Sequence, residues 1–301
     1  MGAPEAAIAL AAAIYGSTFP VIKDGLADVG AVGFLGWRFL LASAVIGLIV
    51  LRLRVRPTSW RRMARATLAA GGCLATGYLF QTVGLEHTSA SASGLVTALY
   101  LPTVPILVAV LTRRGPGAWS LVGVSLATVG LVLVALRPDL TLGLGDLLTA
   151  CGALCFAGQI VALDRYSDQP PLLLTLGQML AVAVVAWTLV PIAGGADVTG
   201  RAGWLAIAYT GLLTAPTAFF LQAWGQRRSP PVRAGVIFAL EPAFAVLFSA
   251  LVRGEHLSAR AALGAVLILG GIAATLRAPR PDDGLSREAP LRTAAPLPPT
   301  R

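Results

Sequence analysis

The chain has 301 residues, of which 56% are hydrophobic and only 12% are charged, and its mean hydropathy is +0.77. Soluble domains carry about 25% charged residues, so these values exclude a water-soluble globule and a largely disordered chain. The net charge of +9 would suggest nucleic acid binding in a soluble protein. Here it comes from arginines in short loops between apolar runs, which is typical of membrane orientation and predicts no nucleic acid partner.

Apolar runs of membrane-spanning length recur along the whole chain. A spanning helix needs about 20 mostly apolar residues, and charged or turn residues separate the runs. The runs lack the alternation of a membrane barrel. We therefore predict an all-α, polytopic membrane protein with ten transmembrane helices, at 6–22, 31–51, 67–85, 91–112, 118–136, 145–163, 171–192, 202–224, 233–252 and 260–277.

The basic residues divide unevenly between the two sets of loops. With a cytoplasmic N-terminus, 17 Lys and Arg residues fall in the cytoplasmic loops and C-terminal tail, against 5 in the outer loops. Cytoplasmic loops are enriched in Lys and Arg, so both termini are predicted to be cytoplasmic. Residues 278–301 contain six prolines, which predicts a disordered cytoplasmic tail.

The second half of the chain repeats the first. A shift of 141 residues aligns glycines and glutamines in corresponding spans: Gln81 with Gln222, Gly84 with Gly225, Gly94 with Gly235, Gly123 with Gly264 and Gly130 with Gly271. We predict two five-helix units, 1–140 and 141–277. Five is odd, so the second unit enters the membrane from the opposite side, as in the inverted repeats of secondary transporters that bind substrate near the midplane.

Two charged residues lie well inside predicted spans. Glu241 is ~12 Å into a hydrocarbon core of ~30 Å. A carboxylate at that depth is costly and marks a functional candidate: it binds a substrate ammonium or accepts a coupling proton. The alternative is a protonated side chain that binds the backbone freed by Pro242. Arg38 either meets a substrate carboxylate or Glu241, or extends to the outer headgroups.

Polar and aromatic side chains inside the spans complete the candidate set. A glutamine facing lipid is expensive, so these amides are expected to face the bundle interior. There they line a pocket or simply bridge helices. The candidates are Tyr15, Trp37, Tyr78, Gln81, Tyr100, Gln159, Gln178 and Gln222.

Several short motifs occur in a recognisable order. They are Tyr15-Gly16-Ser17-Thr18-Phe19 with Lys23, Arg38-Phe39-Leu40-Leu41-Ala42, Thr88-Ser89-Ala90-Ser91, Glu241-Pro242, Gly254-Glu255-His256-Leu257-Ser258 and Gly270-Gly271. With ten spans in two halves, the chain resembles the EamA-type members of the drug/metabolite transporter superfamily. The resemblance implies export of small metabolites, often amino acids or related compounds, across the inner membrane, and adds Ser17 to the substrate-binding candidates.

Motifs for other chemistries are missing from the sequence. The only lysine, Lys23, precedes Asp24, so no P-loop for ATP exists. The only histidines, His87 and His256, lie at span ends. We predict a secondary transporter without catalytic residues, metal or cofactor. Its expected partners are a small-molecule substrate and the lipid bilayer, and a monomer suffices. The alternatives are a multidrug transporter or importer of the same fold, and a membrane sensor without flux.

Overall fold

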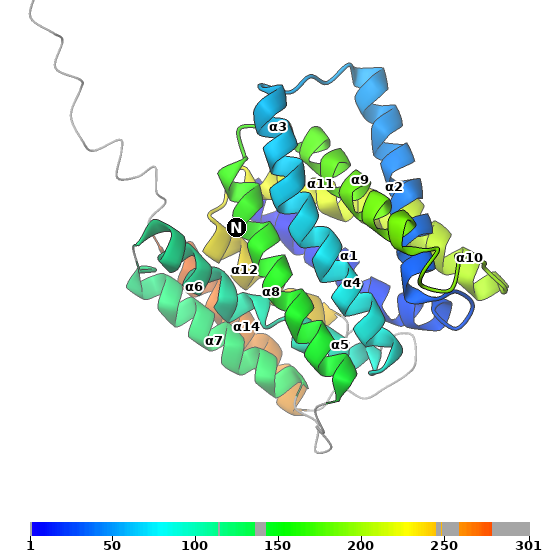
Figure 1. Cartoon of the computed structure of the whole chain (residues 1–301). Helices are drawn as coiled ribbons and strands as arrows, with labels where there is room; N and C mark the ends of the chain where they lie inside the picture. Colours follow the sequence, from blue (N-terminus) through cyan, green and yellow to red (C-terminus); the bar gives the residue numbers. More distant parts are fainter. Residues whose placement is uncertain (1, 114, 136–142, 245–247, 249–258, 279–301) are drawn as a thin grey trace, which may run out of the picture.

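A computed structural model describes residues 2–113, 115–135, 143–244, 248 and 259–278. Every regular element in these ranges is helical (Figure 1). This confirms the all-α prediction. The predicted tail and Glu255 lie outside the described residues.

The first half contains seven α-helices and one π-helical turn. A π-turn is a rare widening of the helix that occurs mostly as a single turn. The elements are α1 (Ala3–Gly25), α2 (Ala31–Leu53), α3 (Trp60–Ala66), η1 (Thr67–Gly71), α4 (Gly72–Glu86), α5 (Ala90–Thr97), α6 (Tyr100–Thr112) and α7 (Ala118–Ala135). Helix α3, the turn η1 and helix α4 form one continuous span.

The second half has a closely similar series. Its elements are α8 (Leu144–Arg165), α9 (Pro171–Leu189), α10 (Arg201–Ala208), η2 (Tyr209–Thr214), α11 (Ala215–Gln226), α12 (Pro231–Phe238) and α14 (Ala259–Leu276). Within the described residues, seven helical segments are long and apolar enough to cross a membrane. The shorter apolar helices Ala118–Leu133 and Ala262–Leu276, together with α12, occupy the remaining predicted spans.

Irregularities of the backbone recur at the 141-residue offset. The π-helical turns η1 and η2 occupy equivalent places in the two halves. Helices α5 and α12 end at equivalent residues, Thr97 and Phe238. Proline explains why α12 ends at Phe238, because Pro242 has no N–H to donate to the Phe238 carbonyl four residues earlier. The repetition therefore extends from the sequence to details of the backbone.

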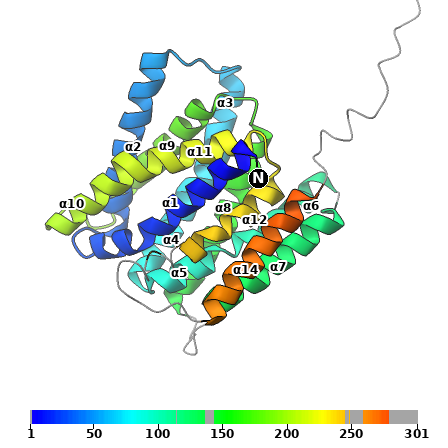
Figure 2. The same cartoon turned by 180° about the vertical axis from the view of Figure 1, so that it is seen from behind.

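Helices of one half pack mainly against helices of the other. The extensively packed pairs are α7 with α14, α4 with α8, α2 with α9 and α1 with α11. Figures 1 and 2 show α7 and α14 side by side at one edge of the bundle in both views. At the 141-residue offset, α1, α2, α4 and α7 correspond to α8, α9, α11 and α14. Replacing each helix by its counterpart therefore gives the same four packed pairs.

Close approach of α7 and α14 depends on glycine. A Cβ added at Gly271 would lie 2.6 Å from the Gly123 carbonyl oxygen and 2.9 Å from the Ala127 nitrogen. Its neighbour Gly270 has open space at the same position. We expect Gly271→Ala to lower the free energy of unfolding by about 1–3 kcal/mol through overpacking, and Gly270→Ala to leave it nearly unchanged. Detergent unfolding curves of the two variants test this, and equal effects would contradict it.

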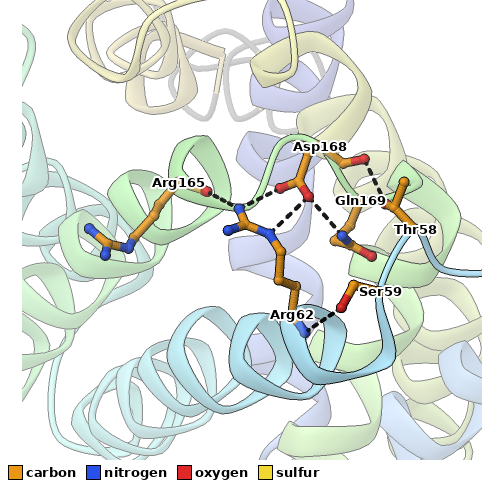
Figure 3. Close-up of polar contacts among 6 residues, drawn as sticks. All are labelled: Thr58, Ser59, Arg62, Arg165, Asp168 and Gln169. Carbon is orange, nitrogen blue, oxygen red and sulfur yellow. Dashed lines mark hydrogen bonds and ion pairs between the residues drawn. The ribbon is translucent and has the colours of Figure 1, made fainter.

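An ion pair links the two halves at one end of the bundle. Arg62 of α3 donates to both Asp168 carboxylate oxygens, at 2.9 and 2.7 Å, and to the Arg165 carbonyl at 3.2 Å (Figure 3). The side chains of Arg62 and Asp168 are 48% and 43% exposed. Exposed pairs contribute only about 0–1 kcal/mol, so this contact orients loops more than it stabilises the fold.

Removing this pair is expected to have a small, salt-dependent effect. The side-chain hydrogen bond from Arg62 lowers the pKa of the Asp168 carboxyl. The pair therefore stabilises the fold above the unfolded carboxyl pKa of about 3.9, and the contribution is lost as the pH falls through the lowered folded value. Asp168→Asn should reduce stability at neutral pH by less than about 1 kcal/mol, with no difference at high salt. A thermal unfolding series in salt checks this.

Candidate functional site

A central cavity lies where the helices of the two halves meet. Its empty volume is about 640 Å³, a figure that includes space open to solvent. Seven of the eleven candidate residues line it: Tyr15, Tyr78, Gln81, Tyr100, Gln159, Gln222 and Glu241. The predicted residues thus come together from α1, α4, α6, α8, α11 and the segment after α12.

Repeat-related residues line this cavity in pairs. Seven pairs at the 141-residue offset contribute both members to the lining: Tyr15 and Phe156, Thr18 and Gln159, Phe19 and Ile160, Tyr78 and Phe219, Gln81 and Gln222, Thr97 and Phe238, and Tyr100 and Glu241. The cavity is therefore centred on the relation between the two halves.

Glu241 is the only acidic residue among the described residues that line the cavity, and it is 9% exposed. The Tyr100 hydroxyl lies 3.4 Å from its Oε2 atom and donates at 2.9 Å to the Phe238 carbonyl. That carbonyl is the one Pro242 leaves without its helical donor. Tyr100, and not Glu241, therefore satisfies the broken backbone, which leaves the carboxyl group available to a ligand.

A chain of buried amides leads from the cavity into the bundle. The Tyr15 hydroxyl donates to Gln222 Oε1 at 2.9 Å. Gln222 Nε2 is within 3.1 Å of Gln159 Oε1 and 3.0 Å of Gln226 Oε1. Gln159 Nε2 donates to Gln178 Oε1 at 2.6 Å. Buried amides satisfied in this way hold one another in fixed orientations, so this wall presents a preset pattern of polar groups.

Aromatic rings form the apolar part of the wall. Tyr78 packs against Phe156 with ring centroids 5.2 Å apart and against Phe219 at 6.1 Å. Tyr15 packs edge-on against Phe219 at 5.2 Å. Such rings bind apolar bodies and, through their faces, cations. With a single carboxyl group, the wall suits a ligand that has a cationic group and an apolar portion.

Arg38 lies behind the cavity wall. It is 1% exposed, so the interpretation that it extends to the headgroups is wrong. Its guanidinium carbon is 5.1 Å from the Phe39 ring centroid and 5.2 Å from that of Tyr78, and Nε and Nη1 have no hydrogen-bond partner. Both Arg38 and Glu241 are among the described residues, and they form no ion pair.

The three other candidates also lie outside the cavity lining. The Ser17 hydroxyl is 2.6 Å from the Ile14 carbonyl and 2.9 Å from the Tyr209 hydroxyl. Trp37 donates from Nε1 to the Ala196 carbonyl at 2.9 Å and packs against Trp187. Gln178 reaches the cavity only through Gln159. These side chains bridge helices, which was the alternative that the sequence left open.

Sequence reasoning missed part of the lining. Thr18 and Thr97 carry no signal as single polar residues in apolar spans. Phe156 and Phe219 resemble ordinary core residues, yet they are the repeat counterparts of Tyr15 and Tyr78. Applying the 141-residue shift to each aromatic candidate would have identified both.

Comparison with known proteins identifies the fold and the family. The EamA-like transporter family matches the chain twice, over residues 4–136 and 143–277. A protein of Archaeoglobus fulgidus described as an uncharacterized transporter is 30% identical over 263 residues, covering 87% of this chain and 82% of that protein.

A solved crystal structure supports the same fold. It superposes with a TM-score of 0.74 at 19% identity, covering 89% of this chain and 94% of the other, and at that identity it bears on the fold alone. The two family matches together span nearly all of the described helices. The chain therefore belongs to the EamA-like transporter family and is a multi-pass membrane transporter.

Proposed function

We propose that the protein is a secondary transporter that exports small amphiphilic metabolites bearing a positive group, such as amino acids or related amines. It works by alternating access, in the inner membrane, with both termini in the cytoplasm. The observation that carries the proposal is the cavity between the halves, in which Glu241 is the only acidic group among the described lining residues and the rest are aromatic, aliphatic, threonine and glutamine side chains. An ammonium group would pair with this carboxylate while the rings cover its apolar body.

The two halves would be inverted repeats of residues 1–140 and 141–277. The recurrence of π-turns and helix breaks at equivalent places supports this reading. In such a fold the two units exchange conformations, which moves the opening of the central cavity from one side to the other. Protonation of Glu241 would release an ammonium ligand and couple its export to proton entry.

Flux from proteoliposomes tests this function. Purified protein is reconstituted into vesicles that hold a mixture of amino acids, polyamines and aromatic amines, and a pH gradient of either sign is imposed. Mass spectrometry identifies the solutes that leave, with empty liposomes as the control. We expect release of amines with an apolar portion, faster under one sign of the gradient. Release of anions alone would contradict the proposal, and influx alone would support an importer.

A further inference from the structure

The two ends of the cavity are closed differently. Towards the C-terminal ends of α1 and α4, the lining continues along Ile22 and Leu85. Their repeat counterparts, Leu163 and Gln226, are not part of the lining. Glu5 lies about 25 Å from Ile22 along α1, at ~1.5 Å per residue. We call these the Ile22 end and the Glu5 end. Among the described residues, the lining reaches further towards the Ile22 end than towards the Glu5 end.

A buried ion pair joins the two halves at the Glu5 end. Arg233 Nη1, in the first turn of α12, lies 3.3 Å from Glu5 Oε1, and the two side chains are 5% and 1% exposed. Arg233 Nη2 donates at 2.9 Å to the carbonyl of Ala278, which follows α14. The Gly2 N–H donates to Glu5 Oε2 at 3.0 Å. One guanidinium thus holds the starts of α1 and α12 and the end of α14 together.

A buried ion pair of this kind tends to be either fully formed or fully broken. Desolvation offsets most of the attraction in a buried ion pair, so it adds little stability over an apolar contact. Once the helices separate, water enters and solvates both charges, so the cost of parting them falls. A buried pair at the seam of two moving halves therefore favours a closed or a fully open arrangement over intermediate ones.

The equivalent place at the Ile22 end lacks the cation. The counterpart of Glu5 is Asp146, which accepts from the Gly143 N–H at 3.0 Å just as Glu5 accepts from Gly2. Asp146 also accepts from the Thr88 hydroxyl at 2.7 Å. The counterpart of Arg233, however, is Ala92. The carboxylate is repeated and the arginine is not, so the counterpart of the Glu5–Arg233 ion pair is missing at the Ile22 end.

A polar contact within the second half follows the same asymmetry. Gln226 of α11 donates to the Ile160 carbonyl of α8 at 3.1 Å, at the Glu5 end of the cavity. Its counterpart, Leu85, has an apolar side chain and lines the open part of the cavity instead. At the counterpart positions among the described residues, the Ile22 end has neither the ion pair between the halves nor this contact within the second half.

We propose that the Glu5–Arg233 ion pair is the lock of the gate at the Glu5 end, and that it sets a resting conformation in which the cavity opens towards the Ile22 end. This inference rests on the alternating access of the proposed function. Breaking the lock shifts the population towards the opposite-facing state, in which the counterparts of Ile22 and Leu85, namely Leu163 and Gln226, line the cavity.

Thiol accessibility at the two ends tests the lock without any substrate. Cys73, Cys151 and Cys155 are replaced by serine in the full-length protein, and Ile22→Cys or Leu163→Cys is added, one at a time. The proteins are placed in lipid nanodiscs and labelled with a polar maleimide. In the parent protein, we expect the thiol at 22 to react faster. With Arg233→Gln, the thiol at 163 should react roughly tenfold faster and the thiol at 22 more slowly.

The opposite directions of the two changes separate a gate from simple loosening. Faster labelling at both positions would indicate destabilisation and overturn the proposal, as would unchanged rates in folded protein. Arg62→Gln, which breaks the exposed pair to Asp168, is the matched control and should change neither rate.

Further variants keep the test decisive. If Arg233→Gln does not fold, Glu5→Gln removes the same pair. Ala92→Arg places a guanidinium near Asp146 and should slow labelling at 22 by locking the other end; unchanged labelling there would overturn the proposal. Unchanged labelling in a protein that transports counts against the lock alone. A labelling shift in a protein with no flux of any solute counts against the proposed function alone.

Discussion

Glu241→Gln is expected to reduce binding and flux of a cationic solute by roughly 10- to 100-fold. A hydrogen bond to a charged group is worth about 1.5–3 kcal/mol, and about 1.4 kcal/mol corresponds to a tenfold change in affinity. The amide has the size of the carboxyl group and keeps an oxygen atom beside the Tyr100 hydroxyl, which itself donates to the Phe238 carbonyl, so folding should be preserved. Flux of each solute identified in the liposome assay is the measurement.

Two controls make this result specific to charge. Glu241→Asp retains the carboxylate and should keep measurable flux, at a reduced rate because the group is displaced by about one methylene. An uncharged analogue of the same solute should bind equally to the parent and to Glu241→Gln. The proton gradient should no longer accelerate whatever flux remains in Glu241→Gln. Full, gradient-dependent flux in that variant would remove Glu241 from the transport mechanism.

Gln222→Leu is expected to be much more destabilising than the same change at its repeat counterpart, Gln81→Leu. Gln222 makes hydrogen bonds with Tyr15, Gln159 and Gln226, whereas within the part of the chain that the structure describes Gln81 donates to Thr97 alone. Each buried polar group left without a partner costs about 1–3 kcal/mol. The free energy of unfolding should therefore fall by several kcal/mol at position 222, against about 1–3 kcal/mol at position 81.

Unfolding in a denaturing detergent, followed by helix content, measures both variants under the same conditions. Because Gln81 and Gln222 occupy equivalent places in similar spans, the comparison cancels the general cost of losing an amide in the bundle. Equal destabilisation would show that the amide chain does not act as a connected network.

Much of the architecture was predictable because the bilayer imposes simple rules. An apolar run must be about 20 residues long and its backbone must be internally satisfied, so the helices follow from hydropathy. The repeat followed from glycines that are needed where helices touch, such as Gly123 and Gly271. Glu241 was recognisable because an isolated carboxyl group inside a span is rarely without a role.

The remaining site residues were not predictable one by one, because a polar residue inside a span has two physical solutions. Gln178 and Trp37 bridge helices, while Gln81 and Tyr78 line the cavity, and the same cost of facing lipid places all four in the interior. The side chain of Arg38 points inward because its guanidinium group packs against the rings of Phe39 and Tyr78. These rings come from different helices, so the sequence near Arg38 does not reveal the contact. Glu5 lies just before the first predicted span, 6–22, and nothing near it in the sequence indicates Arg233, 228 residues away.

Protection of a cavity thiol by the transported solute tests the central claim most directly. In a protein whose three native cysteines are replaced by serine, Thr18→Cys places a single thiol in the cavity wall. Thr58→Cys in the same background places a single thiol on an exposed loop and is the control. N-ethylmaleimide labelling is measured with and without the solute identified by flux. The account predicts that the solute slows labelling at 18 in proportion to its occupancy and leaves labelling at 58 unchanged. Full transport with no protection at 18 would place the substrate elsewhere and contradict the account.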